Sequence, residues 1–132
     1  MNNKIMKKLI VLFIILTLIF ALAGCSKNNV VDTNEVFKLY PTQNIWTFLK
    51  LDTRNGKIWQ VQYAINDDEK RFSVPLNTIS LIEDSESKVG RFILNPTQNM
   101  YNFILLDQID GRMWQIQWSP EEANRGIVDE IK

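Results

Sequence analysis

The sequence predicts an all-β protein, in which two tandem three-stranded repeats form one small barrel or sandwich with pseudo-two-fold symmetry. The main observation is an internal repeat, because residues 36–64 and 91–119 match at 13 of 29 positions without a gap. The second observation is that apolar and polar residues alternate in both copies with the period of a half-buried strand. Matches at Trp, Pro and Gly are rarely obtained from composition alone, so we expect the same structural unit twice.

The first 24 residues are expected to be a signal peptide rather than part of the fold. Three lysines precede an almost wholly apolar segment, residues 9–20, which is shorter than the about 20 residues of a membrane-spanning helix. The sequence LAGC follows at Leu22–Cys25. This motif resembles the lipobox of bacterial lipoproteins. The resemblance implies cleavage before Cys25, diacylglycerol on its sulfur and a further acyl chain such as palmitate on its amine. An uncleaved anchor with a chance cysteine is the alternative.

The lipobox resemblance also implies a location in the cell envelope, with the protein lipid-anchored to a bacterial membrane on its extracytoplasmic side. Two acyl chains hold a protein stably on a bilayer, whereas one chain is marginal. Residues 25–35 are mostly polar and aperiodic, so we expect a flexible tether between the lipid and a single β domain over residues 36–132. The sequence leaves open whether the membrane is an inner or an outer one.

Composition excludes some classes of partner. Cys25 is the only cysteine, so no disulfide within the chain is expected. Removal of residues 1–24 takes three of the 15 basic residues and none of the 15 acidic ones, which leaves a net charge of −3 over 108 residues. No basic run remains, so nucleic acid is not an expected partner.

Each repeat is expected to contain a short strand followed by a hairpin. The short strands end at Pro41 and Pro96, because proline cannot donate to a strand ladder. The tetrapeptide PTQN then forms a turn in both copies, in which the Thr and Asn side chains bond their own backbone. The hairpin loops are residues 53–56 and 108–111, and each ends in a glycine suited to a left-handed conformation.

The loop length sets the register of each hairpin. Asp52 pairs with Lys57, so Lys50 pairs with Trp59, and the second copy pairs Leu105 with Trp114. This register places the aromatic residues on one face, expected to be the core face, and the glutamines on the opposite, wetted face. The tryptophans assigned to the core are Trp46, Trp59, Trp114 and Trp118.

The segments outside the repeats are shorter and less regular. The connector, residues 65–90, contains RFSVPLN and ISLIE, which predict two further short strands, and then a solvated turn. The tail, residues 120–132, is expected to begin with a short helical turn after Ser119, and its RGIV echoes RFSV.

The hairpin sequence LDTRNGKIWQ, residues 51–60, looks like the inner hairpin of β-propeller blades. Two such units are too few to close a propeller, so the resemblance is kept at the level of a motif.

The residues available for catalysis are limited. Histidine is absent and the one thiol is expected to carry lipid, so Ser–His, Cys–His and histidine–zinc sites cannot be assembled. No phosphate-binding glycine loop is present, and no metal or cofactor is expected. Asp52 and Asp107 could form the carboxylate pair of a hydrolase, but an aspartate before a tight turn more often bonds the loop backbone.

These patterns favour a non-catalytic module that binds an envelope protein or a glycan. The glutamine face could bind a polar ligand, although such residues are more often the wet side of a sheet. The middle strands also carry apolar residues on the glutamine side of the sheet. These residues need cover from a partner or from a second copy in a homodimer. The alternatives are a small envelope hydrolase using Asp52 and Asp107, and an exclusion or immunity-type lipoprotein. The candidate binding residues are Gln60, Gln62, Gln115, Gln117, Leu49 and Ile104.

Overall fold

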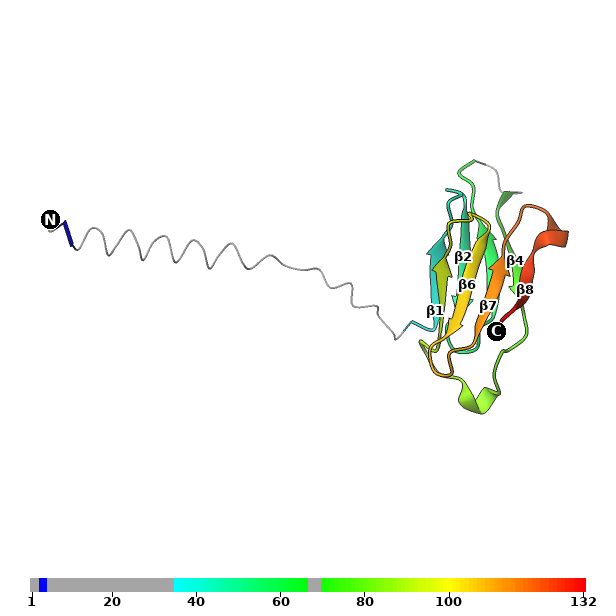
Figure 1. The fold of residues 1–132 in the computed structure, drawn as a ribbon. Coiled ribbons are helices and arrows are strands. Elements are labelled where there is room, and N and C mark those ends of the chain that lie inside the picture. Colours follow the sequence, from blue (N-terminus) through cyan, green and yellow to red (C-terminus); the bar gives the residue numbers. More distant parts are fainter. Residues whose placement is uncertain (1–2, 5–34, 67–69) are drawn as a thin grey trace. The chain divides into compact units, whose positions relative to one another are not determined.

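The computed structural model describes residues 3–4, 35–66 and 70–132, and Cys25 with its cleavage site lies outside these ranges. The β domain is all-β, as predicted, and its described strands form two four-stranded antiparallel sheets, each in chain order (Figure 1). The first sheet contains β1 (Phe37–Pro41), β2 (Thr47–Asp52), β3 (Ile58–Gln62) and β4 (Phe72–Asn77). The second sheet contains β5 (Phe92–Pro96), β6 (Asn102–Asp107), β7 (Met113–Gln117) and β8 (Gly126–Ile131).

Each repeat contributes three strands to its sheet, and the segment after the repeat contributes a fourth. The structural unit therefore has one strand more than the three that the sequence predicts. The fourth strands are β4 and β8, which contain the similar sequences SV and IV within RFSV and RGIV. Each pairs antiparallel with the third strand of its repeat, with one shift of register along the pair. In the tail, the expected helical turn is the 3₁₀ turn η3 (Glu122–Asn124), and the Ser119 hydroxyl oxygen accepts a hydrogen bond from the Glu121 N–H at 3.1 Å.

The second strand predicted in the connector, over residues 79–83, does not form. The side-chain amide of Asn77 donates to the carbonyl oxygens of Gly56 at 3.0 Å and Ile79 at 2.8 Å. These bonds turn the chain as soon as β4 ends, and the 3₁₀ turn η2 (Asp84–Glu86) follows. The connector thus adds β4 to the first sheet and then crosses to the second sheet without a further strand.

The predicted hairpin register is confirmed in both copies. Lys50 lies opposite Trp59 and Leu105 lies opposite Trp114. The two PTQN turns also form alike, because the Thr42 hydroxyl donates to the carbonyl oxygens two and five residues later at 3.0 and 2.9 Å, and Thr97 does the same at 3.0 Å in both cases. The repeated tetrapeptide is therefore the bend that leads from the first strand into the hairpin.

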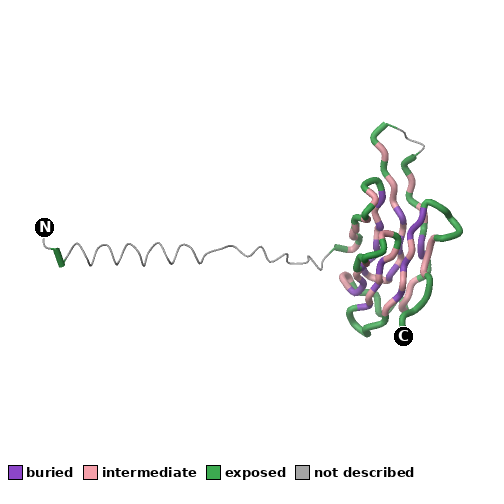
Figure 2. The backbone as a smooth tube through the Cα atoms, turned by 45° about the horizontal axis from the view of Figure 1, so that its top comes forward, coloured by how far each residue is buried: buried purple, intermediate pink, exposed green. Residues whose placement is uncertain are grey.

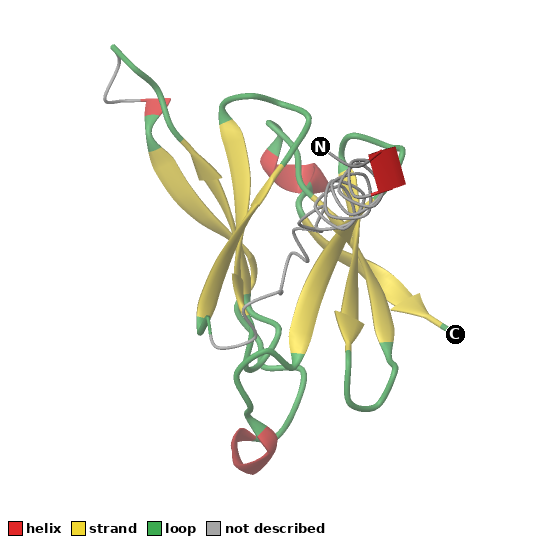
Figure 3. Cartoon of the chain, turned by 90° about the vertical axis from the view of Figure 1, so that its left-hand side faces the viewer, coloured by secondary structure: helices red, strands yellow, loops and turns green. Residues whose placement is uncertain are grey.

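The two sheets pack face to face as separate layers, and neither closes into a barrel (Figure 3). One hydrogen bond between their backbones, from the Phe92 N–H to the Thr53 carbonyl at 2.8 Å, joins the start of β5 to the first hairpin loop. Buried and more exposed residues alternate along the strands, as Figure 2 shows, so each sheet has an inner face toward the other sheet and an outer face.

The two repeats bury opposite faces, so the predicted pseudo-two-fold symmetry is wrong. A two-fold axis would bury the same face of each copy. The inner face of the first sheet is instead formed by Leu49, Leu51, Ile58 and Gln60. The inner face of the second sheet is formed by Phe92, Leu94, Phe103, Leu105, Trp114, Ile116 and Trp118. The repeats are therefore stacked in the same direction, and the outer face of each corresponds to the inner face of the other.

Lys50 accounts for this choice of face. It occupies the position that Leu105 has in the second copy, at the centre of the middle strand. An ammonium group buried without a charged partner is costly, and leucines at 49 and 51 offer an apolar alternative on the opposite side of the same strand. The first sheet therefore turns its Lys50 side outward.

Two matched glycine substitutions test the stacking. Gly56 and Gly111 have φ of 78° and 82°, so alanine at either position should cost about 1–2 kcal/mol of unfolding free energy. A Cβ on Gly56 would also lie 2.8 Å from Leu81 Cδ1 and 3.3 Å from Phe92 Cε1, whereas no described atom lies within 4 Å of one on Gly111. We expect Gly56→Ala to cost about 1 kcal/mol more than Gly111→Ala in urea unfolding. Equal losses would contradict the packing around Gly56.

Candidate functional site

The outer face of the first sheet exposes a cluster of aromatic side chains among the described residues. Phe37 and Tyr63 on this face are 52% and 43% exposed, whereas their counterparts Phe92 and Trp118 in the second repeat are 0% and 1% exposed. Contiguous apolar surface of this kind marks interaction sites in soluble proteins. The face is formed by Phe37, Leu39, Trp46, Phe48, Lys50, Trp59, Val61 and Tyr63.

The rings of this outer face already contact one another. The Trp46 and Tyr63 ring centroids lie 5.3 Å apart, and those of Phe37 and Trp59 lie 6.4 Å apart in an edge-on arrangement. The Lys50 ammonium nitrogen lies 4.4 Å from the Trp59 ring centroid, a cation–π contact. Because cross-strand pairs hold the rings in place, little side-chain entropy remains to be lost on binding.

The outer face of the second sheet is mostly aliphatic rather than aromatic, and it is half-buried on β5, β6 and β7 but exposed on β8. Its amide groups are engaged within the sheet or with the tail, since Gln115 Nε2 donates to Asn102 Oδ1 at 2.9 Å and Gln117 Nε2 donates to the Asn124 carbonyl at 3.0 Å. The face is formed by Ile93, Ile104, Leu106, Met113, Gln115, Asp129 and Ile131.

Two of the predicted binding residues lie inside the domain. Gln60 is 1% exposed, and its Oε1 accepts a hydrogen bond from the Ser119 N–H at 3.3 Å across the two sheets. Leu49 is fully buried in the core. The expectation that both residues are on an accessible face is therefore wrong, and the reason is the reversed stacking of the first sheet.

The other predicted residues keep some exposure. Gln62, Gln115, Gln117 and Ile104 are all partly exposed, and a binding role for them stays a prediction. Of the tryptophans, Trp114 and Trp118 lie in the core as predicted. Trp59 is only partly buried and Trp46 is exposed, so their assignment to the core is wrong.

A shallow cleft of about 390 Å³ lies at the edge of the aromatic face. Trp46 and Tyr63 line this cleft, together with Gln62 and Asn66. Rings next to amide groups are the pattern that would suit a sugar or another ligand with one apolar side.

The two duplicated aspartates are engaged in their own turns. Asp52 Oδ1 accepts the Arg54 N–H at 3.0 Å, and its Oδ2 is 2.8 Å from the Arg54 guanidinium. Asp107 Oδ1 accepts the Ile109 N–H at 2.9 Å. The predicted turn role is confirmed for both.

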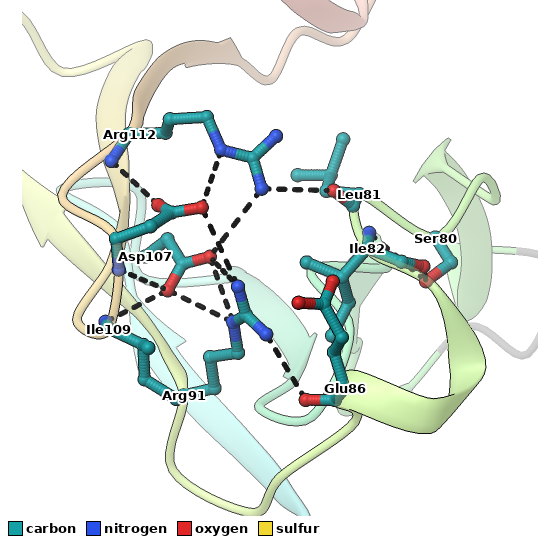
Figure 4. A network of polar contacts seen from close by, with 9 residues as sticks. Ser80, Leu81, Ile82, Glu86, Arg91, Asp107, Ile109 and Arg112 are labelled. Carbon is teal, nitrogen blue, oxygen red and sulfur yellow. Dashed lines mark hydrogen bonds and ion pairs between the residues drawn. The ribbon is translucent and has the colours of Figure 1, made fainter.

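The arginine partner of each aspartate comes from a different place. Arg91, the residue directly before β5, is buried. Its Nε donates hydrogen bonds to both carboxylate oxygens of the fully buried Asp107 at 2.9–3.0 Å (Figure 4). Arg91 also donates to the Glu86 carbonyl at 3.1 Å, and Arg112 extends the network to Asp110 at 2.7 Å. This network fastens the connector to the second hairpin loop.

The pKa of Asp52 disfavours an acid–base role. Burial raises this pKa. The opposite effect is larger in total, because the pKa is lowered by hydrogen bonds from the Arg54 side chain and backbone, by the Arg54 charge and by the Asn55 amide. The pKa of Asp52 therefore lies below its ordinary value. A general acid needs a raised pKa in order to hold a proton near neutral pH. Asp52 is thus suited to a constant negative charge that closes the turn.

Within the described residues, no group of three or more His, Cys, Asp or Glu side chains is placed to hold a metal ion. The same part of the chain contains no helix that is long and apolar enough to cross a membrane. Comparison with known proteins found no family model, curated protein or solved structure that matches this chain.

Acid titration tests the role of Asp52. Its folded pKa lies below the unfolded value of about 4, so its stabilisation is complete above pH 4 and is lost as the pH falls through the folded pKa. We expect Asp52→Asn to lower the unfolding free energy by about 1–3 kcal/mol at pH 7, and the deficit should shrink below pH 4. Urea unfolding from pH 7 to pH 2 measures this, with Glu83→Gln on the exposed connector as control. A deficit that does not change with pH would contradict the ion-pair role.

Proposed function

We propose that this protein is a lipid-anchored lipoprotein of the bacterial envelope and a non-catalytic binding module. Its binding site is the outer face of the first sheet, and its partner is a protein. One observation carries the choice of partner: this face corresponds, residue for residue, to the face of the second sheet that packs against a β-sheet within the same chain. The inner face of the second sheet packs against a β-sheet, so its counterpart, the outer face of the first sheet, is suited to bind a β-sheet of another protein.

The anchor rests on sequence alone, because Cys25 lies outside the described residues. LAGC at the end of a short apolar segment supports cleavage and lipidation there. The part of the tether after the lipidated cysteine, residues 26–35, would span roughly 30 Å when extended, enough to hold the β domain clear of the lipid headgroups.

The hydrolase alternative has less support than binding. Asp52 and Asp107 each accept hydrogen bonds from their own loop, and each forms an ion pair with an arginine. Both carboxylates are buried with these partners, whereas a retaining or inverting pair must flank a substrate. An exclusion or immunity role would use the same outer face, so it belongs to the protein-binding class.

A glycan is a second candidate ligand, and the cleft at Trp46 is the observation that favours it. The rings of Trp46 and Tyr63 would stack on a sugar face, and Gln62 and Asn66 would bond its hydroxyl groups. The cleft occupies only one end of the outer face, so a glycan would leave Phe37 and Leu39 uncovered. Protein binding therefore accounts for more of the exposed surface.

Metabolic labelling tests the anchor. We expect a labelled fatty acid to be incorporated into the wild-type protein and not into Cys25→Ser, because no other thiol is present. The variant should also leave the membrane fraction. Label that persists in Cys25→Ser would rule out the lipobox assignment.

Crosslinking in native membranes tests the binding face. Leu39→Lys places a charge at a position that is 58% exposed on the outer face, so it should preserve the fold and lower recovery of the crosslinked partner at least about tenfold. Ile79→Lys, at a 72% exposed connector position, is the matched control and should recover the partner as the wild type does. If both variants recover it equally, the outer face of the first sheet is not the site.

A further inference from the structure

We propose that the protein bound by the outer face of the first sheet is a second copy of this chain, docked head to tail through the outer face of its second sheet. This inference rests on the proposed function, in which that face binds a protein. The contact would repeat, between two copies, the packing that each copy already contains between its own sheets.

The repeat itself supplies the complementarity. The inner face of the first sheet, with Leu49, Leu51, Ile58 and Gln60, has its counterpart in Ile104, Leu106, Met113 and Gln115 on the outer face of the second sheet. The inner face of the second sheet has its counterpart on the outer face of the first. The two surfaces left free are thus the same pair that the domain joins internally, and they lie on opposite sides of the stack.

The two loop glycines have different surroundings, because Gly56 has an aromatic neighbour from the other sheet and Gly111 has none among the described residues. Phe92 packs beside Gly56 in the first hairpin, with Cε1 3.3 Å from the position of a Cβ. Its counterpart Phe37 is half exposed, and no atom of the described residues lies within 4 Å of a Cβ placed on Gly111. In a head-to-tail contact, Phe37 of one copy would lie beside Gly111 of the next.

The internal interface also contains two polar contacts that a second copy could repeat. The Phe92 N–H donates to the Thr53 carbonyl at 2.8 Å, and the Ser119 N–H donates to Gln60 Oε1 at 3.3 Å. The counterparts of the second contact are the Ala64 N–H and Gln115 Oε1. A glutamine on the outer face is no obstacle to docking, because Gln60 is buried at the same place in the internal interface.

Lys50 is the position at which the free face differs most from its buried counterpart, Leu105. Its ammonium group would have to meet an acidic or aromatic group in the contact. Lys50 already lies over Trp59 at 4.4 Å, and the outer face of the second sheet carries the opposite charge at Asp129. The two free faces therefore carry charges of opposite sign at these positions.

A contact between different faces either closes into a ring or continues as a filament. Four-stranded sheets stacked in this way close into propellers of about four to eight sheets. With two sheets in each copy, closure corresponds to roughly two to four copies. All the copies would be tethered to one membrane through their lipids.

Cysteine crosslinking of the full-length protein in membranes tests this assembly. Ala64 lines the cleft at the edge of the outer face of the first sheet, and Gln115 lies on the outer face of the second sheet. A short thiol crosslinker is therefore expected to join Ala64→Cys to Gln115→Cys between two copies and not within one chain. The double variant should give linked dimers and higher multiples. Each single variant alone should stay unlinked, and co-expression of the two single variants should give dimers and nothing larger. Wild type, whose only thiol is Cys25, controls for the lipidated position.

Other results would overturn the inference. Dimers formed by a single variant alone would mean that identical faces meet, and an unlinked double variant would mean that copies do not dock. If the double variant stays unlinked while Leu39→Lys still abolishes capture of a different envelope protein, the inference fails and the proposed function stands. If neither experiment links the outer face to any protein, both fail.

Discussion

The burial of one face of β2 and β3, and not the other, is the constraint on which the rest of the structure depends. Both sides of β2 carry apolar residues, so hydrophobicity alone does not choose between them. A single lysine at position 50 makes one side costly to bury, and the second repeat has Leu105 at that position. The two copies therefore bury opposite sides and stack in one direction, which leaves two unlike faces free instead of two like ones.

Local chemistry explains which parts of the fold could be predicted from sequence. The turn tetrapeptide, the loop glycines and the two-residue period fix register within a hairpin, and these predictions are confirmed. However, the two-residue alternation of a strand only assigns residues to two faces. When both faces contain apolar residues, it does not indicate which face is buried. The repeat pattern does not include the fourth strands, because β4 contains Pro75 whereas β8 is largely polar and exposed, so the two segments do not match each other closely.

The candidate site was missed for the same reason. The repeat pattern places the aromatic residues of both copies in the core, and only the difference between Lys50 and Leu105 indicates otherwise for the first copy. Burial of Gln60 could not be inferred either, because it leaves Nε2 without a hydrogen-bond partner among the described residues, at a cost of about 1–3 kcal/mol. The ion pair of Arg91 with Asp107 was also beyond the repeat pattern, since the first repeat has Val36 at that position.

The edges of the two sheets are protected, whereas their outer faces are not. A bare edge strand invites pairing with another chain, and proline and charged residues prevent it. Pro41, Pro75 and Pro96 lie in the edge strands β1, β4 and β5. The remaining edge strand, β8, carries the exposed carboxylates of Asp129 and Glu130. The proposed association through the faces would use side chains, where sequence differences such as Lys50 can select one partner, rather than the backbone of the edges, which any strand could pair with.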